Sequence, residues 1–177
     1  MSELETPRLH LRSFSDDDLD AFSALTANEG FMRFSGGGAL DREKTAALLE
    51  RIMVRTRQNL PAQFVVFDRA ESKLLGYCGF FLQTVDGVEE LEIGYRLHPD
   101  YWNRGIASEA SQAMRDHAFR HLKLERVISL IHPDNHASRR VAEKMGMKLE
   151  KHTTFKTFPT NVFAISRAEW ERLPRDA

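Results

Sequence analysis

The chain has 177 residues and a formal net charge of −1 at pH 7, so its length suits one domain with a sizeable core. The balanced charge gives no basic field for nucleic acid, and the apolar runs are far shorter than a membrane span. The acidic start lacks the apolar stretch of a signal peptide, and a single cysteine, Cys78, excludes an internal disulfide. We therefore expect a soluble cytoplasmic protein with no nucleic-acid or membrane partner.

The N-terminal part of the chain predicts a strand followed by a helix. Residues 8–14 alternate apolar and polar side chains, which is typical of a strand. Ser15 is a residue that commonly caps helix N-termini, and the acidic triplet 16–18 falls in the first turn, where the helix dipole favours acids. Apolar residues at helical spacing continue to about Ala27. We interpret the triplet as helix-start chemistry, because a metal site would need further oxygen ligands.

Residues 28–40 predict a loop that contains Phe31, Met32, Phe34 and the three consecutive glycines 36–38. Apolar side chains in a loop either plug the core or line a binding cleft. The pattern leaves both open, and we favour the cleft.

The middle of the chain predicts a helix and three neighbouring strands. Asp41 caps a helical pattern that runs to about Asn59. The apolar runs 63–68, 74–82 and 89–97 are joined by short links, which favour an antiparallel meander.

The stretch 100–110, DYWNRGIASEA, follows the third of these strands and opens a helical pattern over 105–121. A strand that turns through glycine into a helix presents unpaired N–H groups at the positive end of the helix dipole, which suits an anion. Gly105 allows close approach of a ligand to the backbone, and Arg104 can add a charged contact to phosphate. The alternative is an ordinary strand-to-helix connection, and the stretch alone does not decide between them.

The C-terminal part begins with the apolar strand 126–131, which should pair in parallel because it follows a strand and a crossover helix. A short helix, two strands and a final turn or helix follow, at 137–145, 147–151, 161–166 and around Trp170. No repeat or linker interrupts the chain. The prediction is one mixed α/β domain over residues 1–177.

Three polar residues are candidates for chemistry. Glu92 lies in the third strand on the same face as Gly94 and Arg96, so it either faces a cleft or forms a solvated salt bridge with Arg96. Asn135 and Ser138 begin the short helix, where Asn135 is a good N-cap and Ser138 would be residue N3. Capping and function are compatible there.

The histidines and the cysteine predict no metal or nucleophile. His117 and His121 have the spacing of two metal ligands on a helix, but no third ligand is evident, so we expect surface histidines. Cys78 lies in an apolar strand, which favours a buried, inert thiol.

Several motifs in order carry a family resemblance. They are ETPRLHLR at 5–12, EIGY at 92–95, YWNRGIASEA at 101–110, and NHAS at 135–138 followed by EKMGM at 143–147. The chain resembles the GNAT superfamily of acyl-CoA-dependent N-acyltransferases, and more narrowly its ribosomal-protein N-terminal (Rim-type) branch. The likeness covers most of the chain.

The resemblance implies a central, mostly antiparallel sheet flanked by helices, with one parallel strand pair splayed for acyl-CoA. The pyrophosphate of the coenzyme would bind the turn before the long helix, and the pantetheine arm would pair with backbone near Leu97, as an added strand does. The residues implied at the coenzyme are Leu97, Trp102, Asn103, Arg104, Gly105, Ile106, Ala107, Ser108 and Asn135. No metal is implied.

The resemblance also implies direct attack of a neutral amine on a thioester, without a covalent enzyme intermediate. An α-amine has a pKa of roughly 7.7–8.0, against about 10.4 for lysine, so it needs only a weak base. Glu92 is the candidate base. The family's usual acid is a tyrosine at the place of Ala142, and Ser138 is the best substitute here. Asn135 would position the thiol arm or a water.

We therefore expect an acetyl-CoA-dependent N-acetyltransferase, a monomer or homodimer, that acts on the N-terminal α-amine of a protein or peptide. A small amine as acceptor and a non-catalytic acyl-CoA sensor are the alternatives. The resemblance places Phe31, Phe34 and Phe158 beside the acetyl group, where exposed rings could clamp an extended peptide. The alternative is that they plug the core.

Overall fold

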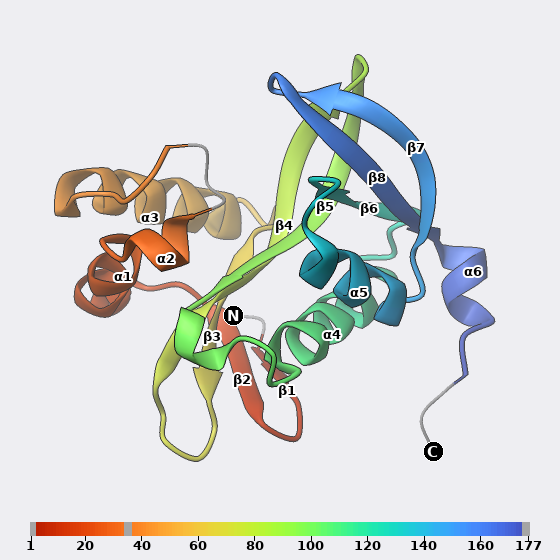
Figure 1. Cartoon of the computed structure of the whole chain (residues 1–177). Coiled ribbons are helices and arrows are strands. Elements are labelled where there is room, and N and C mark those ends of the chain that lie inside the picture. The colour runs from red at the N-terminus through yellow and green to blue at the C-terminus, as the bar shows by residue number, and fades with distance from the viewer. Residues whose placement is uncertain (1–2, 34–36, 175–177) are drawn as a thin grey trace. The chain divides into compact units, whose positions relative to one another are not determined.

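A computed structural model describes residues 3–33 and 37–174 (Figure 1). The described residues form two compact units. The first unit draws on 1–79 and 95–110, and the second on 80–94 and 111–177. The boundaries between the units fall inside β4 (Leu74–Val85) and β5 (Val88–Leu97), so both strands contribute to both units. No helix in the described ranges is long and apolar enough to cross a membrane.

The first unit contains a sheet in the order β1-β2-β3-β4-β5. Its other strands are β1 (Glu3–Glu5), β2 (Leu9–Ser13) and β3 (Gln63–Asp68), and β1, β2, β3 and β4 pair antiparallel in that order. Leu9 and Leu11 are fully buried while His10 and Arg12 beside them are only half-buried, so the predicted alternation is confirmed. The predicted strand 63–68 has the bounds of β3.

Two glycines allow β4 to lie close to its neighbours in the first unit. A Cβ on Gly76 would collide with the carbonyl oxygen of Arg96, and one on Gly79 would lie 2.6 Å from the carbonyl oxygen of Ala62. Real Cβ atoms do not approach backbone so closely, so glycine is required at both positions.

The helices of the first unit are η1 (Asp16–Asp18), α1 (Leu19–Thr26), α2 (Glu29–Met32), α3 (Arg42–Arg57) and η2 (Pro99–Tyr101). The helical segment after Ser15 and the helix after Asp41 begin where the sequence predicts, whereas α2 and η2 were not predicted. Ser15 and Asp18 form a capping box, and Arg12 pairs with Asp18 at 2.7 Å, so the acidic triplet is helix-start chemistry. Buried hydroxyls of Thr26 and Thr45, 2.6 Å apart, tie α1 to α3.

The predicted loop 28–40 needs correction. Asn28 caps the short helix α2 by accepting from the Phe31 N–H, and Phe31 and Met32 are each only 3% exposed. The Phe31 ring packs edge-on against Tyr77 with centroids 6.0 Å apart. The interpretation of these two side chains as a cleft wall is therefore wrong, because α2 turns them into the core. Phe34 lies outside the described residues.

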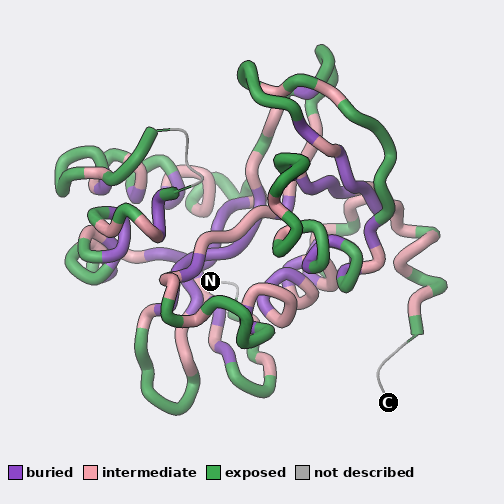
Figure 2. The backbone as a smooth tube through the Cα atoms, viewed as in Figure 1, coloured by how far each residue is buried: buried purple, intermediate pink, exposed green. Residues whose placement is uncertain are grey.

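The second unit contains a sheet in the order β4-β5-β6-β8-β7, with buried residues along its inner strands (Figure 2). Its further elements are β6 (Arg126–Ile131), β7 (Lys148–Phe155), β8 (Phe158–Ser166), α5 (His136–Lys144) and α6 (Arg167–Glu171). Most of α4 (Ile106–Arg120) also belongs to it. The pair β5–β6 is parallel, with Glu92 opposite Ile128, and β6, β8 and β7 pair antiparallel. The mixed α/β class with one parallel pair is confirmed.

The C-terminal strands are longer than predicted. Residues 153–160, which lie between the two predicted strands, instead form the end of the β7–β8 hairpin, with Phe155 opposite Phe158. Its two turn residues, Lys156 and Thr157, both have positive φ. Such turns usually carry Asn or Gly, so the sequence gives no signal for this one.

Candidate active site

The turn before α4 has the geometry of an anion site. Asn103 and Gly105 have φ of +58° and +77°, so the backbone turns sharply before the helix. The Glu109 N–H donates to the Gly105 carbonyl at 3.1 Å. Since Glu109 is the fourth residue of α4 and is the first to make an i to i−4 bond, the N–H groups of Ile106, Ala107 and Ser108 have no such partner within α4. They lie at the positive end of the helix dipole, where phosphate binds favourably.

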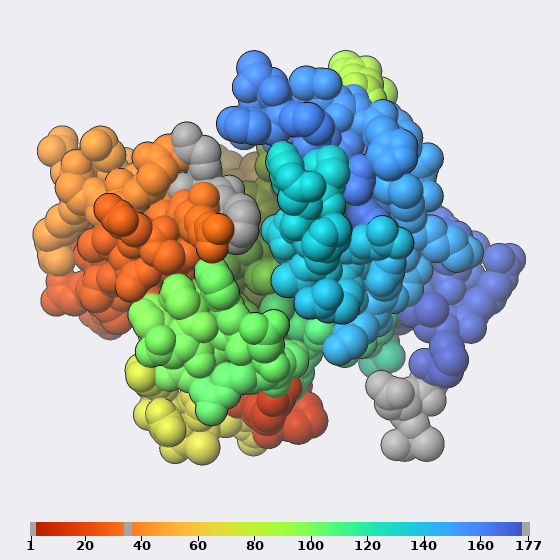
Figure 3. Space-filling view, viewed as in Figure 1, coloured from red at the N-terminus to blue at the C-terminus, as the bar shows by residue number. Residues whose placement is uncertain are grey.

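The same turn is open to solvent. Residues 102–105 are exposed, and the green segment that leads into α4 lies on the surface (Figure 3). A Cβ on Gly105 would meet only the Arg8 guanidinium, at 3.3 Å. Because Gly105 has no side chain, a phosphate can approach the backbone of the turn directly.

Trp102 holds the strand end that precedes the turn. Its indole Nε1 donates to the Leu97 carbonyl at 2.8 Å, while the His98 N–H donates to Leu75 of β4. Because alternate residues of a strand direct their backbone groups to opposite sides, the Leu97 groups point away from β4. The Leu97 carbonyl already accepts one bond on this side, from Trp102.

Glu92 lies where the parallel ladder of β5 and β6 gives way to side-chain bonds. Its carboxylate accepts from Gln83 Nε2 at 2.8 Å and from the Leu130 N–H at 3.4 Å. One residue further along each strand, the Ser129 hydroxyl donates to the Ile93 carbonyl at 2.8 Å. Side chains thus replace ladder bonds beyond the Glu92–Ile128 pair, which agrees with a strand pair that separates.

Asn135 and Ser138 stand at the start of α5, also in the second unit. The Asn135 side chain accepts from the Ser138 N–H at 3.1 Å, so the predicted cap is confirmed with Ser138 at N3. Both residues are half-buried. Ala142, the place of the family's usual tyrosine, is 1% exposed, so this position packs inside the unit.

The aromatic candidates differ in exposure. Phe158 is 55% exposed, whereas Phe31 is buried in the other unit. Phe155, opposite Phe158, packs partly against the buried cluster of Val85 and Ile128. Phe158 thus has a free face, and Phe31 does not.

One histidine departs from expectation. His117 is buried rather than a surface residue, with its ring near Phe80 and stacked on His121 at 5.2 Å. Burial lowers its pKa, and the neighbouring His121 lowers it further. Within the described ranges, no group of three or more His, Cys, Asp or Glu side chains is placed to hold a metal.

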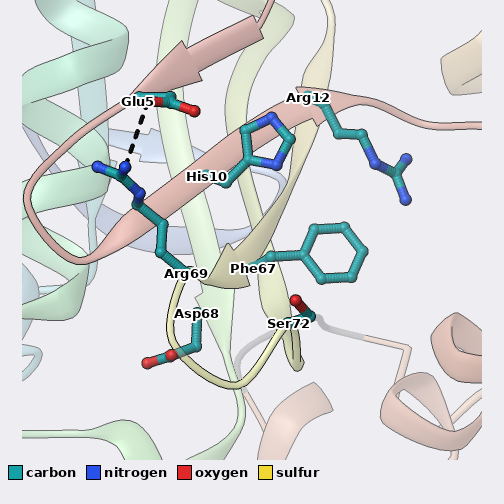
Figure 4. A pocket seen from close by; sticks show the side chains of 7 residues that line it. All are labelled: Glu5, His10, Arg12, Phe67, Asp68, Arg69 and Ser72. Atoms are coloured by element: carbon teal, nitrogen blue, oxygen red, sulfur yellow. Dashed lines mark ion pairs between the residues drawn. The ribbon is translucent and has the colours of Figure 1, made fainter.

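A pocket of about 290 Å³ lies elsewhere in the first unit (Figure 4). Its lining residues are Glu5, His10, Arg12, Phe67, Asp68, Arg69 and Ser72. None of the predicted site residues lines it. Its guanidinium groups are engaged, since Arg12 pairs with Asp18 and Arg69 with Glu5.

Sequence reasoning missed the residues that support these groups. Thr6 and Arg8 both bond Glu109, and Gln83 bonds Glu92. The first three lie in the family-like motifs, which marked the positions but not their contacts.

Comparison with known proteins identifies the family. A family model described as an acetyltransferase (GNAT) domain matches residues 8–148. The chain belongs to the GNAT acetyltransferase family.

Individual relatives agree with this assignment. An uncharacterized N-acetyltransferase of Bacillus subtilis is 31% identical over 147 residues, covering 83% of each chain. The crystal structure of a GNAT-family acetyltransferase from Bacillus anthracis has a TM-score of 0.79 at 29% identity, covering 94% of this chain and 99% of that one. The protein is therefore an acetyl-CoA-dependent N-acetyltransferase.

Two more distant structures share the fold. A RimL alpha-N-protein acetyltransferase in complex with coenzyme A has a TM-score of 0.78 at 18% identity and covers 93% of this chain and 98% of that one. A Vibrio cholerae spermidine N-acetyltransferase, in complex with coenzyme A and spermine, has a TM-score of 0.77 at 18% identity, covering 94% and 100%. At this identity the likeness extends to the fold alone.

Proposed function

We propose that the chain transfers an acetyl group from acetyl-CoA to the N-terminal α-amine of a protein or peptide, as enzymes of the Rim-type branch do. The observation that carries the coenzyme part is the exposed turn at Gly105, with its unpaired N–H groups at the start of α4. The acceptor part rests on the family-like motifs and on the exposed ring of Phe158. A small amine is the second candidate, since a spermidine enzyme is as similar in fold as the RimL enzyme.

The residues of the turn fit coenzyme A. Their N–H groups would hold the pyrophosphate, and Gly105 leaves room for it. Acetyl-CoA supplies a thioester carbonyl that an amine can attack directly. The protein then needs to accept a proton from the amine and to provide one for the departing thiol.

Glu92 is suited to the first of these tasks. Its half-buried carboxylate is held by Gln83, and an acceptor with a pKa of roughly 7.7–8.0 loses its proton to a weak base, directly or through water. Ser138 has a hydroxyl at the N-terminal turn of α5 and is our candidate for the second task. Asn135 orients this turn through its cap.

Gly105→Glu should abolish coenzyme A binding, because it places a side chain and a negative charge in the phosphate turn. The affinity is measured by calorimetry on folded protein. Gly87→Glu is the matched control: Gly87 has φ +80°, like the +77° of Gly105, with nothing within 4 Å of a Cβ. Equal coenzyme A affinity in the two variants would refute the assignment of the turn.

Ser138→Ala should lower kcat by about 10²-fold or more, the range of general acid catalysis, with little change in coenzyme A affinity. Alanine keeps the backbone N–H that donates to Asn135, so the cap and the melting temperature should stay close to wild type. Single-turnover acetylation of a peptide, alongside coenzyme A titration, makes the measurement. Parallel losses in rate and affinity would instead give Ser138 a binding role.

A further inference from the structure

A carboxylate sits beside the phosphate turn and is fully engaged by the N-terminal segment. Glu109 lies in the first turn of α4 with its side chain 16% exposed. It accepts from the Thr6 hydroxyl at 2.6 Å, from the Arg8 N–H at 2.9 Å and from Arg8 Nε at 2.6 Å. Without these donors, a negative charge in this turn would repel a bound phosphate.

The other nitrogens of the Arg8 guanidinium face the turn itself. Arg8 Nη1 donates to the Arg104 carbonyl at 2.8 Å, which fixes the residue just before Gly105. Arg8 Nη2 lies 3.3 Å from the position of a Cβ on Gly105, and no described residue accepts a hydrogen bond from it. The Arg8 side chain is 48% exposed, so this nitrogen is open to a ligand.

We propose that Arg8 is a phosphate-binding residue of the coenzyme site: Glu109 and the Arg104 carbonyl hold its guanidinium so that Nη2 donates to a coenzyme A phosphate at Gly105. The planar fork of arginine suits this arrangement, since it can hold two fixed acceptors and still present a donor. The proposal rests on the proposed function, because it takes the turn to be the coenzyme site.

The variants separate phosphate contact from neutralisation of Glu109. Arg8→Met keeps most of the stem and removes the fork, and should weaken coenzyme A binding about 10- to 100-fold, the value of a charge-assisted hydrogen bond. Arg8→Met combined with Glu109→Gln removes the uncompensated carboxylate as well. It should remain at least tenfold weaker than Glu109→Gln alone, because the phosphate contact is still missing.

Calorimetric titration with coenzyme A and with dephospho-coenzyme A tests the proposal and identifies the phosphate. An equal factor for both ligands places Nη2 on the pyrophosphate, and a loss confined to coenzyme A places it on the 3′-phosphate. Arg12→Met is the matched control, since it removes an arginine from a carboxylate pair of the same unit, with Asp18, away from the turn. Its affinity should equal that of wild type.

Two results would overturn the proposal. One is that the double variant binds coenzyme A as tightly as Glu109→Gln, which would leave Arg8 only a neutralising role. The other applies if Arg8→Met does not fold: Arg8→Lys keeps the charge, and binding at wild-type affinity would show that the fork is not used. A wild-type protein that does not bind coenzyme A at all would refute the proposed function instead.

Discussion

Glu109 is a residue whose charge state ties the fold to pH. Burial raises its pKa, but hydrogen bonds from the Thr6 hydroxyl and from Arg8 outweigh this and hold the pKa below the ordinary value of 4.5. A lowered carboxyl pKa stabilises the fold fully above the unfolded pKa, and that contribution is lost as pH falls through the folded pKa.

Glu109→Gln should therefore reduce the free energy of unfolding at pH 7, by about 1–3 kcal/mol for lost charge-assisted bonds. The difference from wild type should shrink as pH falls below the ordinary carboxyl pKa of 4.5 and through the lowered pKa of folded Glu109, because the wild-type carboxyl is then protonated too. Urea unfolding between pH 3 and 7 measures it, with Glu71→Gln as an exposed control. A difference that stays constant across this range would contradict the argument.

At the residue scale, the sequence predicts what depends on near neighbours. Asn135 is recognisable as a cap because its acceptor and the helix start lie within three residues. Gly105 is recognisable because a strand and a helix pattern meet there. The contact of Arg8 with Glu109 spans 101 positions, so only the fold could reveal that these two side chains meet.

At the scale of elements, strong periodicity predicts where strands and helices lie. The elements that were not predicted are a hairpin whose turn has an unusual sequence and a helix too short to show a period. The strand 126–131 has its predicted bounds, and the helix predicted at 105–121 is observed at 106–120. The β7–β8 hairpin was missed because Lys156 and Thr157 adopt positive φ without the usual glycine or asparagine. The short helix α2 was missed because four residues are too few for a helical period.

The pair β5–β6 is parallel, whereas β6, β8 and β7 in the same sheet pair antiparallel. The crossover through α4 predicts parallel pairing, and the Glu92–Ile128 register confirms it. The bonds of Ser129 to Ile93 and of Leu130 to Glu92 were not predictable, since they depend on how the two strands separate. The resemblance, rather than the pattern, anticipated that separation.

At the scale of the whole molecule, the acceptor site is the part with the least local signal. The single domain remains a prediction. Of the aromatic candidates for the acceptor site, Phe31 of the first unit is buried and Phe158 of the second unit is exposed. A buried ring supports stability and an exposed ring is available to a ligand, so exposure assigns different roles to Phe31 and Phe158.

Phe31→Ala should cost about 3–5 kcal/mol in the free energy of unfolding, the usual range for a buried phenylalanine.

Phe158→Ala should leave the melting temperature and acetyl-CoA affinity close to wild type, because its ring is 55% exposed. If Phe158 contacts the acceptor, the same variant should raise the peptide KM several-fold, since a ring that buries apolar surface on binding is lost. Thermal unfolding and steady-state kinetics with a peptide and with spermidine as acceptors separate these effects. A higher KM for the peptide alone supports the α-amine acceptor, a higher KM for spermidine alone favours the small amine, and unchanged kinetics with both would remove Phe158 from the acceptor site.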